Sequence, residues 1–482
     1  MTNSNSLNIL SLKIKELPEL LLISVLLSLP AVFVSGYLIY FFPIFLIIVL
    51  SLIYGEKFII LFIIISLFTI VGEVSRTLRS MVYLLDFSIL GYFFLRKYGL
   101  NFNNYPKIPR SVIYFLFLYL TALVVSTVMS RFPSAATGII LQQFYFFSIV
   151  YVFYALIQDE ANIKTYFTGI LYVAAIIVIF SLVVFIKDGL SIMEIISPDR
   201  ARVSVITGNI ETSTNFFVVS FPIILGALLL KNKTNTKNSQ LFLIFFLTLG
   251  LVLMMSRSAI LGILLSTGII FFVLKRKLFY RLLIFIALVM LLFIFYQPLN
   301  EILTLFLRIE SGMSARDYLW RMSIDMIKDN PIFGIGPGVY KYEMINYFPY
   351  MLDDWWGRFV IYLGEVSGGA NLSHNFFLSL FTEMGILGIL TAVALPLVFL
   401  RIGIKTINKY KVVSEDKYYL IVSLFAAGCS IILRNFFNGI GLIYVGGLQT
   451  DLPFWLIFSS IIYFYRSPVI NEKKLFAQRS KI

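Results

Sequence analysis

The sequence predicts an all-α polytopic membrane protein with about 12–14 transmembrane helices and one large extracytoplasmic loop domain. Hydrophobic residues make up 59% of the 482 positions, charged residues make up 13%, and the mean hydropathy is +0.91. A chain of this composition cannot cover a soluble surface with polar groups. It also contains many apolar runs that are long enough to cross a bilayer as helices.

Apolar runs of spanning length, taken in order, give fourteen candidate spans. They lie near residues 20–37, 38–54, 58–74, 79–95, 111–130, 134–158, 163–187, 212–230, 239–255, 258–274, 279–297, 375–400, 418–436 and 450–465. The run 20–54 is broken by Pro30, Gly36 and Pro43 and could form two spans or one span with a re-entrant piece, so twelve spans are also compatible. No clear small-residue cleavage site follows Lys13 and Lys15, so we expect a retained first helix rather than a removed signal peptide.

The positions of lysine and arginine orient these spans, because cytoplasmic loops are enriched in both. Clusters such as Lys275–Lys277 fall on one side together with both termini, which are therefore expected in the cytoplasm. The predicted regions are a transmembrane bundle at 1–297, an extracytoplasmic loop with amphipathic helices at 298–373, transmembrane helices at 374–466 and a cytoplasmic tail at 467–482. This topology places the Ser256–Ser258 hairpin, the loop 298–373 and the start of the next helix on the outer face.

The basic residues assigned to the outer face are mostly arginine, whereas those assigned to the inner face are mostly lysine. The outer arginines are Arg76, Arg79, Arg131, Arg200, Arg202, Arg257, Arg308, Arg316, Arg321, Arg358 and Arg434. Arginine captures phosphate oxygens with a rigid, permanently protonated fork, so this bias indicates an anionic ligand such as a diphosphate. The alternative is that these arginines pair with the outer carboxylates or meet anionic lipid headgroups. Those carboxylates are Glu310, Asp317, Asp353, Asp354 and Glu365.

Arg257 interrupts an apolar run from Leu241 to Leu274 that is too long for one span. An arginine at the centre of a membrane helix costs roughly 2.5–3.5 kcal/mol, so the tip of a tight hairpin is the more favourable place. We expect Arg257 at such a tip, flanked by Ser256 and Ser258. A residue that merely separates two spans is the alternative.

The loop 298–373 is too long for a simple connector and is expected to fold as a small domain or lid. Within it, Arg316 to Lys328 has the pattern of an amphipathic helix, with Leu319, Met322 and Met326 at helical spacing and with Tyr318 and Trp320 suited to a membrane interface. Asn330-Pro331 ends this helix, and the run Phe333 to Gly338 follows with three alternating glycines. We favour a conformational role for these glycines over a phosphate cradle.

Histidine occurs once in the chain, as His374. A single imidazole excludes a His-rich metal site and focuses proton transfer at neutral pH on one position. On a continuous helix, Gly385 and Gly388 would lie within about 40° of His374, and Glu383 would lie opposite. A helix N-terminus lowers the pKa of an imidazole, so His374 is expected to be neutral and able to accept a proton. The alternative is a structural histidine at the membrane interface.

These motifs together resemble the O-antigen ligase and O-antigen polymerase superfamily. They are Ser256-Arg257-Ser258, then Arg316-x-x-x-Trp320 leading to Pro331–Gly338, then His374-Asn375 followed by Gly385 and Gly388. The resemblance is best over an O-antigen ligase-like core at about 254–390, and the stretch from Arg202 to Pro222 is also similar but less specific. The signature does not separate ligase from polymerase.

The resemblance implies an inverting, metal-independent glycosyltransferase of the bacterial cytoplasmic membrane. Such an enzyme moves a glycan from a polyprenyl diphosphate, usually undecaprenyl diphosphate, to an acceptor hydroxyl on the outer face. The acceptor is a glycan, a lipid A-core or another hydroxyl. In this sequence Arg257, Arg316 and His374 match the catalytic residues of the family, and Arg202 is a weaker candidate for binding diphosphate. Gly385, Gly388 and Trp320 are expected to be structural positions near the site.

No metal, cofactor or nucleic acid is expected as a partner; membrane lipids are. Cys429 is the single cysteine, so no disulfide framework or CxxC motif is possible. The sequence has no DxD motif of the kind that binds divalent metal in sugar-nucleotide enzymes, and Asp353-Asp354 is interpreted as a solvated acidic turn.

A transporter or flippase for the same lipid-linked glycan is the alternative from another functional class. Such transporters are expected to have internal repeats, paired broken helices and acidic residues within spans that carry coupling protons. The sequence has no obvious internal repeat, no paired broken helices and few acidic residues within spans. Among the enzymes, a polymerase that joins repeat units is favoured slightly over a ligase acting on lipid A-core. A protein O-oligosaccharyltransferase is a third form.

Overall fold

The fold is built from helices in a computed structural model of the chain. The structure describes residues 56–69, 76–157, 160–191, 203, 207, 209–230, 237–297, 315–344, 346–347, 373–443 and 447–468, and in these residues it contains helices, turns and connecting segments but no strand. The long helices are α3 (Glu56–Thr69), α4 (Arg76–Tyr98), α5 (Arg110–Met129), α6 (Pro133–Leu156), α7 (Glu160–Lys187), α9 (Ile210–Leu228), α10 (Lys237–Met254), α11 (Arg257–Leu274), α12 (Arg276–Phe295), α14 (Ala315–Asp329), α17 (Phe376–Tyr410), α18 (Glu415–Arg434) and α19 (Leu448–Arg466).

Nine helices in the described part of the chain are long and apolar enough to cross a membrane. They are α5, α6, α7, α9, α10, α11, α12, α17 and α18. The predicted all-α, multi-pass membrane fold is therefore confirmed. The helices α3, α4 and α19 also coincide with predicted spans, near 58–74, 79–95 and 450–465. The predicted spans 20–37 and 38–54 lie outside the described residues.

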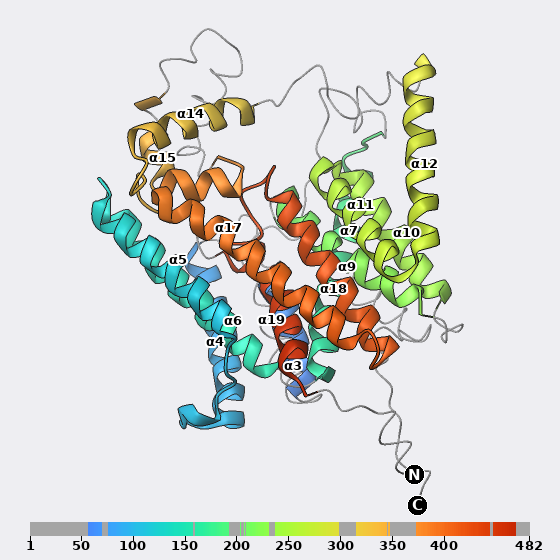
Figure 1. Ribbon diagram of the computed structural model, residues 1–482, viewed down its shortest axis with the longest axis horizontal. Coiled ribbons are helices and arrows are strands. Elements are labelled where there is room, and N and C mark those ends of the chain that lie inside the picture. Colours follow the sequence, from blue (N-terminus) through green and yellow to red (C-terminus); the bar gives the residue numbers. More distant parts are fainter. Residues whose placement is uncertain are drawn as a thin grey trace, which may run out of the picture.

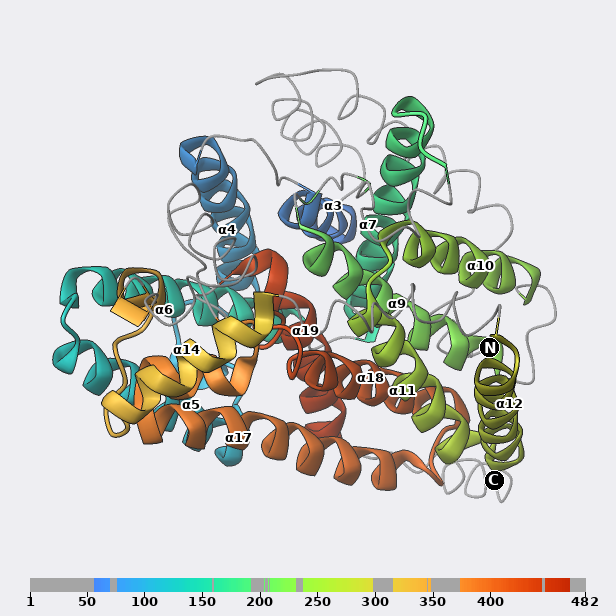
Figure 2. The ribbon, with the colours of Figure 1, turned by 90° about the horizontal axis from the view of Figure 1, so that it is seen from above.

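The helix α18 lies at the centre of the half of the bundle that carries the candidate site. It packs against α9, α11, α17 and α19, while α5 packs along α17 (Figures 1 and 2). The helix α12 stands at the edge beside α11 and buries none of its residues. Because α12 is apolar on every side, its exposure is that of a helix surrounded by lipid.

The helix α17 is longer than predicted and is broken near its start. It runs through Tyr410, beyond the predicted end at 400, and Gly385 has φ 57° and ψ −146°, which is not helical. The backbone groups released at the break bond to the glycine-rich loop Phe333–Gly338 and the two residues before it. Ile335 N donates to Thr382 O at 3.0 Å, Gly336 N donates to Glu383 O at 2.9 Å, and Ile386 N donates to Pro331 O at 3.0 Å.

The break corrects the predicted relation between His374 and the two glycines of α17. The helix begins at Phe376 with Asn375 as its N-cap, so His374 lies outside it, and Gly385 is not helical. The helical spacing that placed Gly385 and Gly388 on a stripe with His374 therefore does not apply. Gly385 instead makes room for the loop, because a Cβ there would lie 2.2 Å from Ile332 O.

The predicted amphipathic helix is confirmed as α14. Leu319, Met322 and Met326 are buried along one face, where they pack with residues of the glycine-rich loop and of the short helix α15 (Tyr340–Glu343). Gly334 has φ 71°, and a Cβ on it would lie 2.4 Å from the carbonyl carbon of Glu383. The glycines thus serve close backbone packing, the conformational role that was favoured. This packing seats α14 against α17 (Figure 1).

Candidate active site

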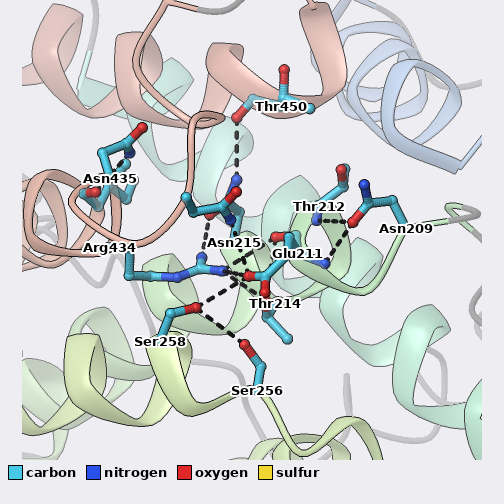
Figure 3. Close-up of polar contacts among 12 residues, drawn as sticks. Asn209, Glu211, Thr212, Thr214, Asn215, Ser256, Ser258, Arg434, Asn435 and Thr450 are labelled. Carbon is cyan, nitrogen blue, oxygen red and sulfur yellow. Dashed lines mark hydrogen bonds and ion pairs between the residues drawn. The ribbon is translucent and has the colours of Figure 1, made fainter. Parts of the chain in front are cut away.

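Glu211, in the first turn of α9, is the meeting point of four segments of the chain. Its Oε2 accepts hydrogen bonds from Ser258 Oγ at 3.1 Å, Asn438 Nδ2 at 3.0 Å and Arg434 at 2.9 Å. Its backbone N–H donates to Asn209, which caps α9 (Figure 3). An acidic residue at a helix N-terminus interacts favourably with the helix dipole, which helps to hold the carboxylate at this end of the bundle.

Arg434, the last residue of α18, is a buried structural arginine. Its side chain is 1% exposed and donates to Glu211, to Thr214 Oγ1 at 2.8 Å and to Asn215 Oδ1 (Figure 3). Arg434 was predicted to lie on the outer face, with pairing to an outer carboxylate as one alternative. The pairing holds, but the carboxylate is Glu211, which was not among the five predicted partners.

Arg316, at the start of α14, approaches the other oxygen of the same carboxylate. Its Nη2 lies 3.6 Å from Glu211 Oε1, and its side chain is 29% exposed. That distance is too long for a hydrogen bond, so this is an ion pair without a directed bond. Arg316 is therefore held much more loosely than Arg434.

Arg257 is the first residue of α11, so the predicted break between two helices at this residue is confirmed, although α10 and α11 do not pack closely against each other as a hairpin would. The helix α10 ends at Met254, and Met255 turns the chain with φ 47°. Ser256 Oγ lies 3.3 Å from Ser258 Oγ, which in turn binds Glu211. The start of α11 therefore lies beside the carboxylate.

His374 occupies a strained position just before α17. Its backbone φ is 54°, which lies in the left-handed region. Residues other than glycine seldom adopt this conformation, and those that do are concentrated at functional sites. The neighbouring residues fix this conformation: Asn375 accepts from Phe377 N and Leu378 N, and Ser373 Oγ donates to Asn375 O at 3.0 Å. The strain is therefore stabilised by local hydrogen bonds on both sides.

The electrostatic surroundings of His374 keep its imidazole neutral. Burial and the nearby positive charge of Arg316 lower its pKa from 6.5 to about 4, and the charge of Glu211 opposes this shift in part. The Nδ1 atom is buried and has no hydrogen-bond partner within the described residues. At neutral pH the imidazole is therefore in its unprotonated form, which is the form that a general base requires.

Further buried polar atoms around the site also lack a partner within the described part of the chain. They are Trp320 Nε1, Asn435 Oδ1 and Arg434 Nε. Trp320 lies four residues after Arg316 on α14, so both project from the same helix face. Unpaired buried polar groups cost about 1–3 kcal/mol each, and a bound ligand or water is a common reason for them.

The remaining predicted site residues have other locations. Gly385 and Gly388 lie at the break of α17, and a Cβ on Gly388 would come within 1.9 Å of Leu380 O. They support the site through the loop that seats α14. Arg202 lies outside the described residues.

The sequence analysis did not predict that Glu211, Arg434 and Asn438 contact one another. Glu211 carried a usable signal, because a carboxylate at the edge of an apolar span requires a partner. Its partner lies 223 positions away, and no sequence pattern joins the two.

Comparison with known proteins agrees with the resemblance seen in the motifs. Residues 242–393 match the model of the O-antigen ligase family. This range includes Arg257, Arg316 and His374, whereas Glu211 and Arg434 lie outside it. No curated protein matches the chain. Residues 242–393 of this multi-pass membrane protein are therefore similar to the O-antigen ligase family.

Proposed function

We propose that the protein is an inverting glycosyltransferase that moves a glycan from a polyprenyl diphosphate carrier to an acceptor hydroxyl. The O-antigen ligase domain implies glycosyl transfer from lipid-linked glycans. The observation that carries the proposal is a strained, buried His374 beside Arg316, one of the two arginines assigned to the diphosphate; burial, and then the charge of Arg316, lower the pKa of His374 and keep it neutral. This proximity supports a reaction in which one residue acts as the base and a neighbouring cation binds the leaving group.

The charge of the site favours an anionic ligand. Within the described residues, Arg316 and Arg434 share a single carboxylate, Glu211, while Arg257 precedes Ser258, which also binds that carboxylate, and His374 is neutral. Arg434 is neutralised by its own bonds to Glu211, and Arg316 approaches the same carboxylate only at 3.6 Å, which leaves positive charge at Arg316. A diphosphate balances this charge and accepts hydrogen bonds from guanidinium groups.

In the proposed reaction His374 removes the proton of the acceptor hydroxyl as its oxygen attacks the anomeric carbon of the donor sugar. The bond from that carbon to the diphosphate oxygen breaks, and the leaving lipid diphosphate keeps the electron pair. Arg257 and Arg316 stabilise the negative charge that develops on the leaving group. Inversion follows because attack and departure occur on opposite faces of one carbon.

The remaining parts of the proposal concern location and product. The site faces the exterior of the cytoplasmic membrane, both termini are cytoplasmic, and the segment 298–373 shapes the acceptor site. A surface polysaccharide polymerase is favoured over a ligase that transfers to lipid A-core.

The test uses purified protein in detergent or liposomes with lipid-linked repeat units, alone and with a candidate acceptor. We expect a product ladder from the donor alone, and a loss of about 10²–10⁴-fold in rate in His374→Ala. Product only with added lipid A-core or protein would identify a ligase or a protein-glycosylating enzyme. A folded His374→Ala protein that transfers at the wild-type rate contradicts the mechanism, and the absence of any covalent product favours the transporter.

A further inference from the structure

The five residues from Arg434 to Asn438 form a segment that contacts both Glu211 and the residues next to His374. Arg434 and Asn438 bind Glu211, whereas Asn435 and Phe436 bind the start of α17 beside His374. We propose that Glu211 is a positioning residue for Arg316, and that this segment, the Arg434–Asn438 clamp, holds Glu211 and His374 in one fixed frame. The inference rests on the proposed function.

The two oxygens of Glu211 have different roles in this arrangement. Oε2 is fixed by donors from three other parts of the chain: Ser258 of α11, Arg434 of α18 and Asn438 beyond it. Oε1 lies 3.6 Å from Arg316 of α14. The carboxylate is thus anchored on one side and presents its other side to the arginine that the proposal assigns to the diphosphate.

The other contacts of the clamp fix the base. Phe376 N donates to Asn435 O at 2.9 Å, and Asn375 Nδ2 donates to Phe436 O at 3.0 Å. These bonds hold the residues immediately after His374. The clamp therefore fixes the distance between the imidazole of His374 and the carboxylate of Glu211, which positions Arg316.

The family match does not assign this role, because Glu211 and the clamp lie outside residues 242–393. Arg316 also cannot be positioned by the surface charges of its own helix. The neighbouring acid on α14, Asp317, pairs instead with Arg321 at 3.0 Å on an exposed face. The partly buried carboxylate of Glu211 on α9 is the one that reaches Arg316.

A positioning role predicts a specific kinetic signature for Glu211→Gln. This change keeps the size of the side chain and removes a negative charge beside an anion site, so donor binding should not weaken. The orientation of Arg316 is lost, and misplacement of about 1 Å at a reacting centre costs about 10²-fold. We expect kcat to fall about 10–100-fold while KM for the donor stays the same or decreases.

Asn438→Ala provides a second, milder variant in case Glu211→Gln does not fold. It removes one of the donors to Oε2 and leaves the Glu211–Arg434 pair in place. We expect a decrease in kcat of about 3–10-fold with KM unchanged, in line with the loss of a single hydrogen bond. Asp317→Asn is the matched control, because it removes an exposed carboxylate adjacent to Arg316 and should change neither constant.

The experiment measures transfer kinetics together with binding of undecaprenyl diphosphate to purified full-length protein. Arg316→Gln should weaken that binding, and adding Glu211→Gln to it should produce little further loss of kcat, because Glu211 acts through Arg316. If wild-type protein neither binds undecaprenyl diphosphate nor transfers, the proposed function itself fails.

Two outcomes overturn the inference while leaving the proposed function intact. In the first, wild-type protein transfers glycan, Arg316→Gln does not, and Asn438→Ala and any folded Glu211→Gln protein retain the wild-type kcat. In the second, Glu211→Gln raises KM without lowering kcat, so Glu211 would bind the donor rather than position Arg316.

Discussion

Arg434 and Arg316 share one carboxylate but are held in opposite ways. Arg434 is 1% exposed and is bonded to Glu211, Thr214 and Asn215, whereas Arg316 is 29% exposed and reaches Glu211 at 3.6 Å. The first is a buried ion pair with its hydrogen bonds almost complete. The second makes only one long ion pair and retains donor capacity.

This difference separates a structural arginine from one suited to a ligand. A guanidinium whose donors are already used cannot bind a diphosphate without breaking buried bonds, which is costly. A loosely paired guanidinium can exchange a weak contact for bidentate bonds to phosphate. Arginines that look equivalent in the sequence therefore divide into two classes by the bonds they make.

The largest expected effect is on stability, from Arg434→Met. Removal of one partner of a buried ion pair leaves Glu211 without its main counter-charge and should lower the free energy of unfolding by about 3–5 kcal/mol. Arg316→Met should cost less than about 1 kcal/mol, because its pair is long and partly exposed. Thermal unfolding in detergent measures both.

The double variant Glu211→Leu/Arg434→Met serves as the control for this explanation. Replacing both charges with apolar groups should regain much of the stability lost in Arg434→Met. Equal losses for Arg434→Met and Arg316→Met would contradict the distinction between the two arginines.

An intermediate effect is expected from Gly385→Ala, which tests how α14, the helix that carries Arg316, is held against α17. A Cβ there would meet Ile332 O at 2.2 Å and would force a left-handed φ of 57° on alanine. The conformational strain alone costs roughly 1–2 kcal/mol, and the clash displaces the loop that follows α14. We expect lower thermal stability together with reduced transfer.

Gly138→Ala is the matched control, because nothing lies within 4 Å of its added Cβ in α6. It should be neutral or slightly stabilising, since alanine favours a helix by about 0.8–1.0 kcal/mol relative to glycine. A Gly385→Ala protein as stable and active as Gly138→Ala would show that the break in α17 does not position α14.

The smallest expected effect is a shift in the titration of His374. Because the chain has one histidine, isotope labelling of histidine gives a single imidazole signal for NMR in detergent. The wild-type midpoint should lie near pH 4, because burial and Arg316 lower the pKa to about 4. Arg316→Gln should move the midpoint upward, whereas Arg434→Lys, which keeps its charge, should move it less.

The same pKa has a consequence for stability. The unfolded chain takes up a proton on His374 near its ordinary pKa of 6.5, whereas the folded chain does so only near 4. His374 therefore lowers the stability of the fold as pH falls from about 6.5 to 4, and His374→Ala should lack this part of the pH dependence. A wild-type midpoint at 6.5 would contradict the buried, Arg316-facing position of the imidazole.

Much of the fold followed from local pattern. Hydropathy located the spans that the structure describes, and the spacing of Leu319, Met322 and Met326 predicted α14. The cost of placing Arg257 within an apolar run predicted the break between α10 and α11. The predicted alignment of Gly385 and Gly388 with His374 on one face of a continuous helix was wrong. Gly385 breaks α17, because the glycine-rich loop supplies alternative partners for the backbone there.

The sequence by itself determined the membrane class and the similarity of residues 242–393 to the O-antigen ligase family, because apolar length and motif order are properties of consecutive residues. Only the tertiary structure decided that Arg434 is buried and bonded to several acceptors, that Arg316 is loosely held and that Glu211 joins them. The physical reason is that burial and pairing depend on contacts between α9, α14 and α18, which are far apart in sequence. No local preference encodes those contacts.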